Sequence, residues 1–245
     1  MRMYYGLAGR ESVIRMEALR GEHVLESFYY PIHPKWRSAY KTMFLDSGAF
    51  TAWKNGETID LHAYAEYALS GDYAFVAGDL RIGDADPETT LKDTEYLSEL
   101  GLNAIPCFHQ GEKWEYLDIM MNYEHISLGC TEKTSTTPSV GRWLRECFER
   151  ICDADGFPRV KVHGFRFTSW MDTFPFFSVD STTWCQSSHP YSFATLSQTF
   201  PFLQPLEIGQ IVKRYYERRP QATRLVPEKV EEETLPLFTG VLQDA

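Results

Sequence analysis

The chain has 245 residues, of which 43% are hydrophobic, so it can bury a substantial core as one domain. Its formal net charge of −10 argues against a globally basic nucleic-acid-binding protein, although a local basic strip is enough for such contact. It contains no run of about 18 apolar residues and no signal-peptide pattern, so we expect a cytoplasmic protein without a membrane span. The five cysteines are widely spaced and indicate neither a disulfide framework nor a zinc motif.

Short apolar runs alternate with helical patterns along the chain, which is typical of βα units around a parallel sheet. The runs predict eight strands: Met3–Leu7, Val24–Tyr30, Met43–Asp46, Tyr73–Asp79, Asn103–Phe108, His125–Leu128, Val160–Phe167 and Phe176–Asp180. Helical spacing predicts helices over Ile59–Leu69, Pro87–Leu100, Lys113–Met121, Val140–Asp153 and Leu206–Arg219. We therefore expect a compact (β/α)8 barrel of the TIM type over residues 1–226, followed by an acidic arm or tail over 227–245.

Two aspartates, Asp46 and Asp180, each end an apolar run and are followed by small residues. In an α/β barrel, the loops at the carboxyl ends of the strands form the active face. Two carboxylates brought there from different strands suggest chemistry at a glycosidic carbon, because a carboxylate can attack a sugar carbon and then leave.

The residues that follow the predicted strands are, in order, Asp46, Asp79, Gln110, Gly129, Gly164 and Asp180. Any one of them alone is more often structural, since Asp, Gly and Gln populate turns and caps. The ordered set resembles the tRNA-guanine transglycosylase family, most of all its zinc-less, DNA-acting, phage-type relatives (DpdA-like).

The resemblance covers about Met43–Trp184 and is made of short motifs. Asp46-Ser47-Gly48-Ala49-Phe50 is similar to the family's D-S-G-G-F segment, and Gln110-Gly111 is similar to its Q-G element. Leu128-Gly129-Cys130-Thr131-Glu132 is similar to the family's G-G-L segment near a Glu. His163-Gly164-Phe165 is similar to its M-G-V-G strand end, and Val179-Asp180 is similar to the strand end that bears its nucleophile. The zinc-binding segment of the family is missing, since only Cys185 and His189 follow Asp180, and this departure favours DNA over tRNA as substrate.

The resemblance implies that guanine in a polynucleotide is exchanged for a 7-deazaguanine through a covalent aspartyl-sugar intermediate. Asp180 would be the nucleophile and Asp46 the general acid and base. The base would be bound by six residues, for each of which a purely structural role is the alternative: Asp79, Gln110, Gly129, His163, Gly164 and Phe50. No metal or other cofactor is expected, and a homodimer is possible.

A basic strip lies on and after the last predicted helix: Lys213, Arg214, Arg218 and Arg219. It is a candidate for phosphate contacts, and the alternative is the solvated end of a helix, where cations favour the helix dipole. Two further functions stay open. One is an N-glycosidase, in which water completes the reaction on a nucleoside, a nucleotide or modified nucleic acid. The other is a non-catalytic, transglycosylase-like binding subunit.

Overall fold

The computed structural model describes residues 1–7, 13–81, 86–130, 135–186 and 189–226. The predicted arm over 227–245 therefore lies outside the described residues. In the described part of the chain, no helix has the length and apolar character needed to cross a membrane.

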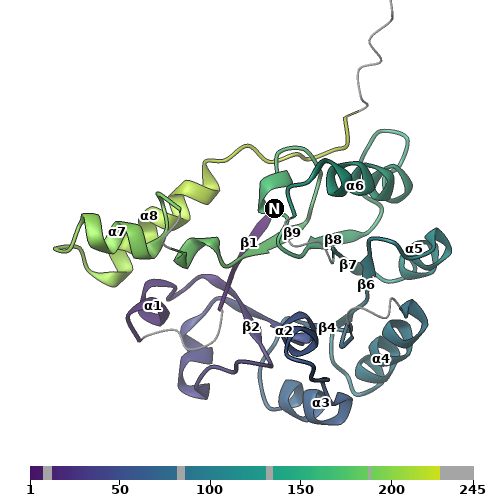
Figure 1. The fold of residues 1–245 in the computed structure, drawn as a ribbon, viewed down its shortest axis with the longest axis horizontal. Helices are drawn as coiled ribbons and strands as arrows, with labels where there is room; N and C mark the ends of the chain where they lie inside the picture. Colours follow the sequence, from purple (N-terminus) through teal and green to yellow (C-terminus); the bar gives the residue numbers. More distant parts are fainter. Residues whose placement is uncertain (8–12, 82–85, 131–134, 187–188, 227–245) are drawn as a thin grey trace, which may run out of the picture.

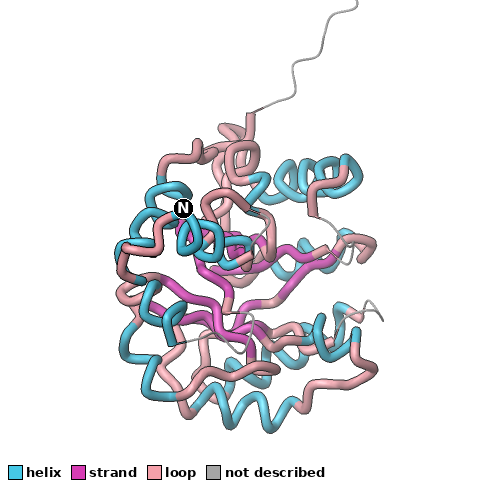
Figure 2. The backbone as a smooth tube through the Cα atoms, turned by 60° about the vertical axis from the view of Figure 1, so that its left-hand side comes forward, coloured by secondary structure: helices cyan, strands magenta, loops and turns pink. Residues whose placement is uncertain are grey.

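The described strands form one parallel sheet that curls into a nearly closed barrel, with helices around its outside (Figures 1 and 2). The barrel confirms the predicted α/β fold of the TIM type. Its strands are β1 (Arg2–Gly6), β2 (His23–Ser27), β3 (Thr42–Asp46), β4 (Phe75–Ala77), β5 (Ala104–Ile105), β6 (Cys107–His109), β7 (His125–Gly129), β8 (Lys161–Gly164) and β9 (Ser178–Ser181). They are ordered β5-β4-β3-β2-β1-β9-β8-β7-β6.

The predicted strand Asn103–Phe108 is divided at Pro106 into β5 and β6, which stand at the two ends of the strand order. Proline has no backbone N–H and cannot complete a ladder. Its carbonyl still accepts a hydrogen bond from the N–H of Ser127 at 2.8 Å, while Gly78 donates to Ile105 at 2.8 Å on the other side. This one segment therefore brings the two edges of the sheet together.

The helices are α1 (Val13–Ala18), α2 (Ala49–Lys54), α3 (Leu61–Leu69), α4 (Pro87–Glu99), α5 (Trp114–Met120), α6 (Pro138–Ile151), α7 (Phe193–Thr199) and α8 (Pro205–Glu217), with 3-10 turns η1 (Pro34–Ala39), η2 (Thr168–Trp170) and η3 (Thr183–Cys185). The longer helices cover the outside of the barrel, whereas α2 lies over its centre in the view of Figure 1. The five predicted helices are present with ends shifted by at most two residues. The short helices α1, α2 and α7 were not predicted.

Side chains alternate between the barrel interior and the helix layer along each strand, as the twofold period of a strand requires. A small buried cluster fills the interior: Tyr4, Leu25, Phe44, Ala77 and Ile105. Their sequence neighbours Val24, Met43 and Val76 pack outward against helices. This alternation decides which strand-end residues face the active end of the barrel.

Gly48 shapes the turn that joins β3 to α2. Its φ of 77° lies in the left-handed region that favours glycine. A Cβ placed on it would also lie 2.4 Å from the Cβ of Tyr29 and 2.7 Å from Oγ of Ser27. Both conformation and space therefore require glycine directly after Asp46-Ser47.

We predict that Gly48→Ala lowers the free energy of unfolding by about 2–4 kcal/mol, the sum of left-handed strain and a steric clash. Gly56→Ala is the matched control, because Gly56 has a φ of 71° but a Cβ placed on it would meet no atom within 4 Å. The control is expected to lose only about 1–2 kcal/mol. Urea unfolding measures both variants, and equal losses would contradict the steric part of the explanation.

Candidate active site

Residues at the carboxyl ends of several strands share the inward orientation of the core side chains beneath them. Asp46 is two residues beyond the interior Phe44, and Asp79 is two beyond the interior Ala77. The same spacing relates His109 to Cys107, Gly129 to Ser127, and Asp180 to Ser178. Because the period of a strand is two, these residues converge on the axis of the barrel at one end.

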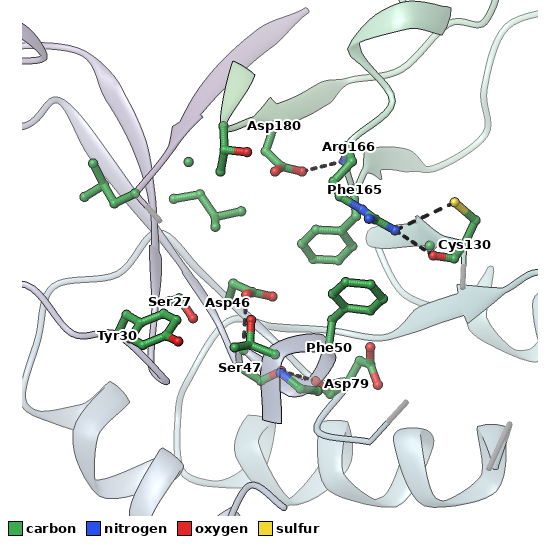
Figure 3. A pocket seen from close by; sticks show the side chains of 18 of the residues that line it. Ser27, Tyr30, Asp46, Ser47, Phe50, Asp79, Cys130, Phe165, Arg166 and Asp180 are labelled. Carbon is green, nitrogen blue, oxygen red and sulfur yellow. Dashed lines mark hydrogen bonds between the residues drawn. The ribbon is translucent and has the colours of Figure 1, made fainter. Parts of the chain in front are cut away.

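They line a cavity of about 350 Å³, which lies within the size range of small-molecule sites. The lining residues are Gly6, Leu7, Leu25, Ser27, Tyr30, Asp46, Ser47, Gly48, Ala49, Phe50, Thr51, Asp79, His109, Gly129, Cys130, Phe165, Arg166, Asp180 and Thr182. Figure 3 shows Asp180 and Arg166 on one side of this cavity and Asp46, Ser47 and Phe50 on the other. Three carboxylates thus face one small space.

Asp180 is 5% exposed and is held from the β8 side of the barrel. Its Oδ1 accepts a hydrogen bond from the backbone N–H of Arg166 at 2.9 Å and lies 3.5 Å from Nε2 of His163. His163 is fully buried, and its Nδ1 is 2.8 Å from Oγ of Ser178. Within the described part of the chain, both contacts involve Oδ1, so Oδ2 is the oxygen available to a ligand.

Arg166 carries the left-handed backbone that makes this contact possible. Its φ is 63°, an uncommon value for a residue with a side chain. The guanidinium donates to the carbonyl oxygen of Cys130 at 2.9 Å and lies 4.7 Å from the ring centroid of Phe50. Strained backbone of this kind is concentrated at functional sites, which supports a role for Arg166 in the cavity.

Asp46 ends β3 and remains partly exposed to the cavity. Its Oδ2 accepts a hydrogen bond from the backbone N–H of Gly48 at 3.1 Å. Burial, followed by repulsion from Asp180 and Asp79, raises the pKa of Asp46 to about 7, against the opposing effects of the Gly48 N–H and Arg166. A carboxyl group with this pKa can both give and accept a proton near neutral pH.

Asp79 lies in a second polar group that includes His109, Cys107 and Glu112. Nε2 of His109 is 3.1 Å from Oδ2 of Asp79 and 3.5 Å from Sγ of Cys107, and its Nδ1 is 3.4 Å from Oε1 of Glu112. Burial opposes a charge on His109, but Cys107 and Asp79 outweigh burial and raise the pKa of His109 well above its ordinary value. The imidazole is thus paired with the carboxylate of Asp79, and the donor set N, O and S is one that can hold a metal ion.

Five of the predicted site residues line the cavity together: Asp46, Asp79, Gly129, Phe50 and Asp180. Among the described residues, Gln110, Gly164 and His163 do not line it. Gln110 and Gly164 fall on the outward phase of their strands. Gln110 donates to Oγ of Ser139 at 3.1 Å, and a Cβ on Gly164 would lie 2.6 Å from the Phe176 ring. His163 points inward but lies one layer below the cavity, where its ring contacts Tyr4 and Phe44.

The structure places Lys213 of the basic strip at the opposite end of the barrel. Its Nζ is 2.8 Å from Oε1 of Glu22, directly before β2, and it lines a hollow with Met1 and Lys41, which precede β1 and β3. Tyr216 and Glu217, at the end of α8, line the same hollow. A polymer whose base entered the cavity would therefore have to extend to the other end of the barrel to contact Lys213.

The sequence did not single out Arg166, Tyr30 or Ser27 as cavity residues. Arg166 and Tyr30 lie in loops, whose conformation no apolar period predicts. Ser27 ends β2 two residues beyond the interior Leu25, so the twofold period of the strand is the signal that could have found it. Thr131 and Glu132 of the predicted motif lie outside the described residues.

A comparison with protein-family models finds no match for this chain, and a comparison with curated proteins finds none either.

We predict that Asp46→Asn stabilises the protein at alkaline pH. A raised pKa means that the folded protein binds the proton more tightly than the unfolded chain, so this contribution to stability is present at low pH and is lost as the pH rises through about 7. Because Asp46 is partly exposed, we expect the variant to exceed the parent by about 1–3 kcal/mol at pH 8.

Urea unfolding at several pH values checks this expectation. The advantage of Asp46→Asn should grow between pH 4 and pH 7 and level off above it. Asp118→Asn, at an exposed position of α5, should show no such trend. A constant difference between Asp46→Asn and the parent across this range would contradict the raised pKa.

Proposed function

We propose that the protein is a base-exchange glycosyltransferase, which replaces guanine in a polynucleotide with a 7-deazaguanine. The observation that carries the proposal is the pairing of two aspartates across one cavity. Asp180 is oriented by the Arg166 N–H with one oxygen available, and Asp46 has a pKa suited to proton transfer at neutral pH. Resemblance of the strand-end motifs to the tRNA-guanine transglycosylase family points to the same two residues.

The proposed reaction has two steps. Oδ2 of Asp180 attacks C1′ of the sugar as the bond from C1′ to the guanine nitrogen breaks, and Asp46 gives its proton to that nitrogen. The incoming base then loses its proton to Asp46 and attacks C1′, which releases the Asp180 carboxylate. The nucleophile and the proton are both restored, so no cofactor is consumed.

The aromatic rings of Phe50 and Phe165 line the cavity and offer flat surfaces to a base. Both lie near the Arg166 side chain (Figure 3). Aromatic faces and guanidinium groups stack on bases without regard to their sequence context. A base reaches a cavity at the end of a barrel only from a single strand or after extrusion from a duplex, and DNA is the favoured polymer because the family's zinc segment is missing.

A second candidate is an N-glycosidase acting on a nucleoside or nucleotide. Of the described lining residues, three are aspartates, and Arg166 is the sole lysine or arginine. Its guanidinium already donates to Cys130. His109, whose pKa is raised, is paired with Asp79. The cationic groups of the described lining thus already have partners, which favours an uncharged nucleoside over a phosphate close to the cavity. In that reaction water takes the place of the incoming base.

We predict that the protein incorporates radiolabelled guanine into single-stranded DNA, and that Asp180→Asn abolishes incorporation. Asp46→Asn should lower the rate by about 10²–10⁴-fold, the usual contribution of general acid–base catalysis. The parent's rate should change with pH near 7, and this inflection should be absent in Asp46→Asn. Asp118→Asn is the control and should keep the parent's rate.

Duplex DNA, tRNA and free nucleosides should be tested in parallel. Incorporation into tRNA alone would identify tRNA, and not DNA, as the substrate polymer. Release of base without incorporation would select the N-glycosidase. Neither incorporation nor release with any of these substrates would contradict both enzymatic candidates and favour a binding subunit.

A further inference from the structure

A cluster of three side chains with different donor atoms lies in the wall of the cavity. The carboxylate of Asp79, the thiol of Cys107 and the imidazole of His109 are all buried, and their donor atoms lie within 4.8 Å of one another. Asp79 comes from the end of β4, whereas Cys107 and His109 are both on the inward phase of β6. From this cluster we propose a zinc-type metal site that the sequence analysis does not expect.

The spacing of the donors is the first argument. A tetrahedral zinc ion with bonds of about 2.0–2.3 Å holds its nitrogen and oxygen ligands about 3.3 Å apart, and its nitrogen and sulfur ligands about 3.6 Å apart. In this structure, Nε2 of His109 lies 3.1 Å from Oδ2 of Asp79 and 3.5 Å from Sγ of Cys107. Two of the three donor pairs therefore already have the spacing of a zinc site, and the third pair, Asp79 and Cys107, is within 4.8 Å.

The surroundings of His109 are the second argument. Nδ1 lies 3.4 Å from Oε1 of Glu112, whose side chain is 1% exposed, and the other oxygen of Glu112 accepts the His109 backbone N–H at 2.9 Å. A carboxylate at one ring nitrogen fixes the proton there and directs the other nitrogen, Nε2, to a metal. Glu112 is thus a positioning residue for His109.

Gly129 supplies the third argument. A Cβ on this residue would lie 3.0 Å from Nε2 of His109 and 3.2 Å from Sγ of Cys107. Glycine on β7 therefore leaves room beside the two donors, and Gly129 itself lines the cavity. Any larger residue would crowd the donor atoms of His109 and Cys107.

The fourth ligand position would face the cavity. Asp79 and His109 line the cavity, and Cys107 is fully buried behind them. Three protein ligands and one open position are the arrangement of catalytic rather than structural zinc sites. The open position would take water or a neutral oxygen or nitrogen donor of the substrate. With the ion bound, Asp79 is a ligand and not a free acceptor for the base edge.

The donor types favour zinc among the common ions. Thiolate and imidazole are ligands of zinc and related transition metals, whereas magnesium and calcium select sites built from oxygen. The site does not depend on base exchange, because metal binding can be measured without any substrate. An experiment that contradicts base exchange therefore does not contradict the metal site, and the reverse also holds.

The test uses the full chain, stripped with a chelator and then titrated with Zn²⁺. We expect one zinc per chain by elemental analysis and a rise in the thermal midpoint, since an ion that binds the folded state stabilises it. Cys107→Ser should weaken binding by more than about 100-fold, and Glu112→Gln by about 10–100-fold. Cys185→Ser, another buried thiol outside the cluster, is the control and should bind zinc as the parent does.

Co²⁺ provides a readout on the parent that does not require the variants to fold. The stripped parent should give the intense visible spectrum of a tetrahedral site together with a thiolate-to-cobalt charge-transfer band, and that band should be absent in Cys107→Ser. A parent that takes up no zinc, or a cobalt complex without the thiolate band, would overturn the proposal. So would a folded Cys107→Ser variant that binds zinc as tightly as the parent. The cluster would then be an ion pair between Asp79 and His109 with a neighbouring thiol.

Discussion

Repulsion among three carboxylates in one small cavity is the constraint that organises this site. Parallel strands with inward side chains bring Asp46, Asp79 and Asp180 to the same end of the barrel, and the fold gives each a different environment. Asp79 is paired with His109, and Asp180 accepts the N–H of Arg166. Asp46 keeps one backbone donor, and its pKa is raised by burial and, after that, by repulsion from Asp180 and Asp79. Chemically identical groups thereby become suited to different roles.

The scaffold supports these environments through details of the backbone. Arg166 has the left-handed φ that directs its N–H to Asp180, and Gly48 has the left-handed φ that directs its N–H to Asp46. Glycine adopts this conformation without strain, whereas arginine does so at a cost of roughly 1–2 kcal/mol. The guanidinium contacts with Cys130 and Phe50 offset part of that cost. A rigid barrel tolerates such local strain because the strands beneath it are fully packed.

Much of the fold could be predicted from the sequence, because regularly spaced apolar residues indicate which side chains of a strand or helix are buried. The eight apolar runs correspond to the strands, and Pro106 explains why one run becomes two strands. Helices α1 and α2 have six residues each and are too short to display a helical period. The twofold period of a strand also predicts which of the proposed base-binding residues face away from the barrel axis. Counting from Phe108, which packs outward, places Gln110 outward as well.

Other features of the site require the three-dimensional arrangement. Cys107 and His109 are two residues apart and could be recognised as a pair of possible ligands. Asp79 is far from them in sequence and reaches them only because β4 pairs with β5, which Pro106 joins directly to β6. No pattern in the sequence around Arg166 predicts its positive φ. Sequence periods therefore identify the residues that face the barrel axis, while contacts between neighbouring strands decide which of those residues meet.

The order of the strands also separates two parts of the cavity. Asp180 lies on β9, and Arg166 lies in the loop after β8. Cys107 and His109 lie on β6, and Asp79 follows β4, so these three belong to the β4–β6 arc. Asp46 ends β3, which is beside that arc. Asp46 is the residue that both parts influence, because its pKa responds to Asp180 as well as to Asp79. A ligand bound at the arc can therefore change proton transfer at Asp46 without touching the carboxylate that would attack the sugar. In the proposed reaction, recognition and nucleophilic attack would therefore be carried by different strands, and the electrostatic interaction through Asp46 would connect them.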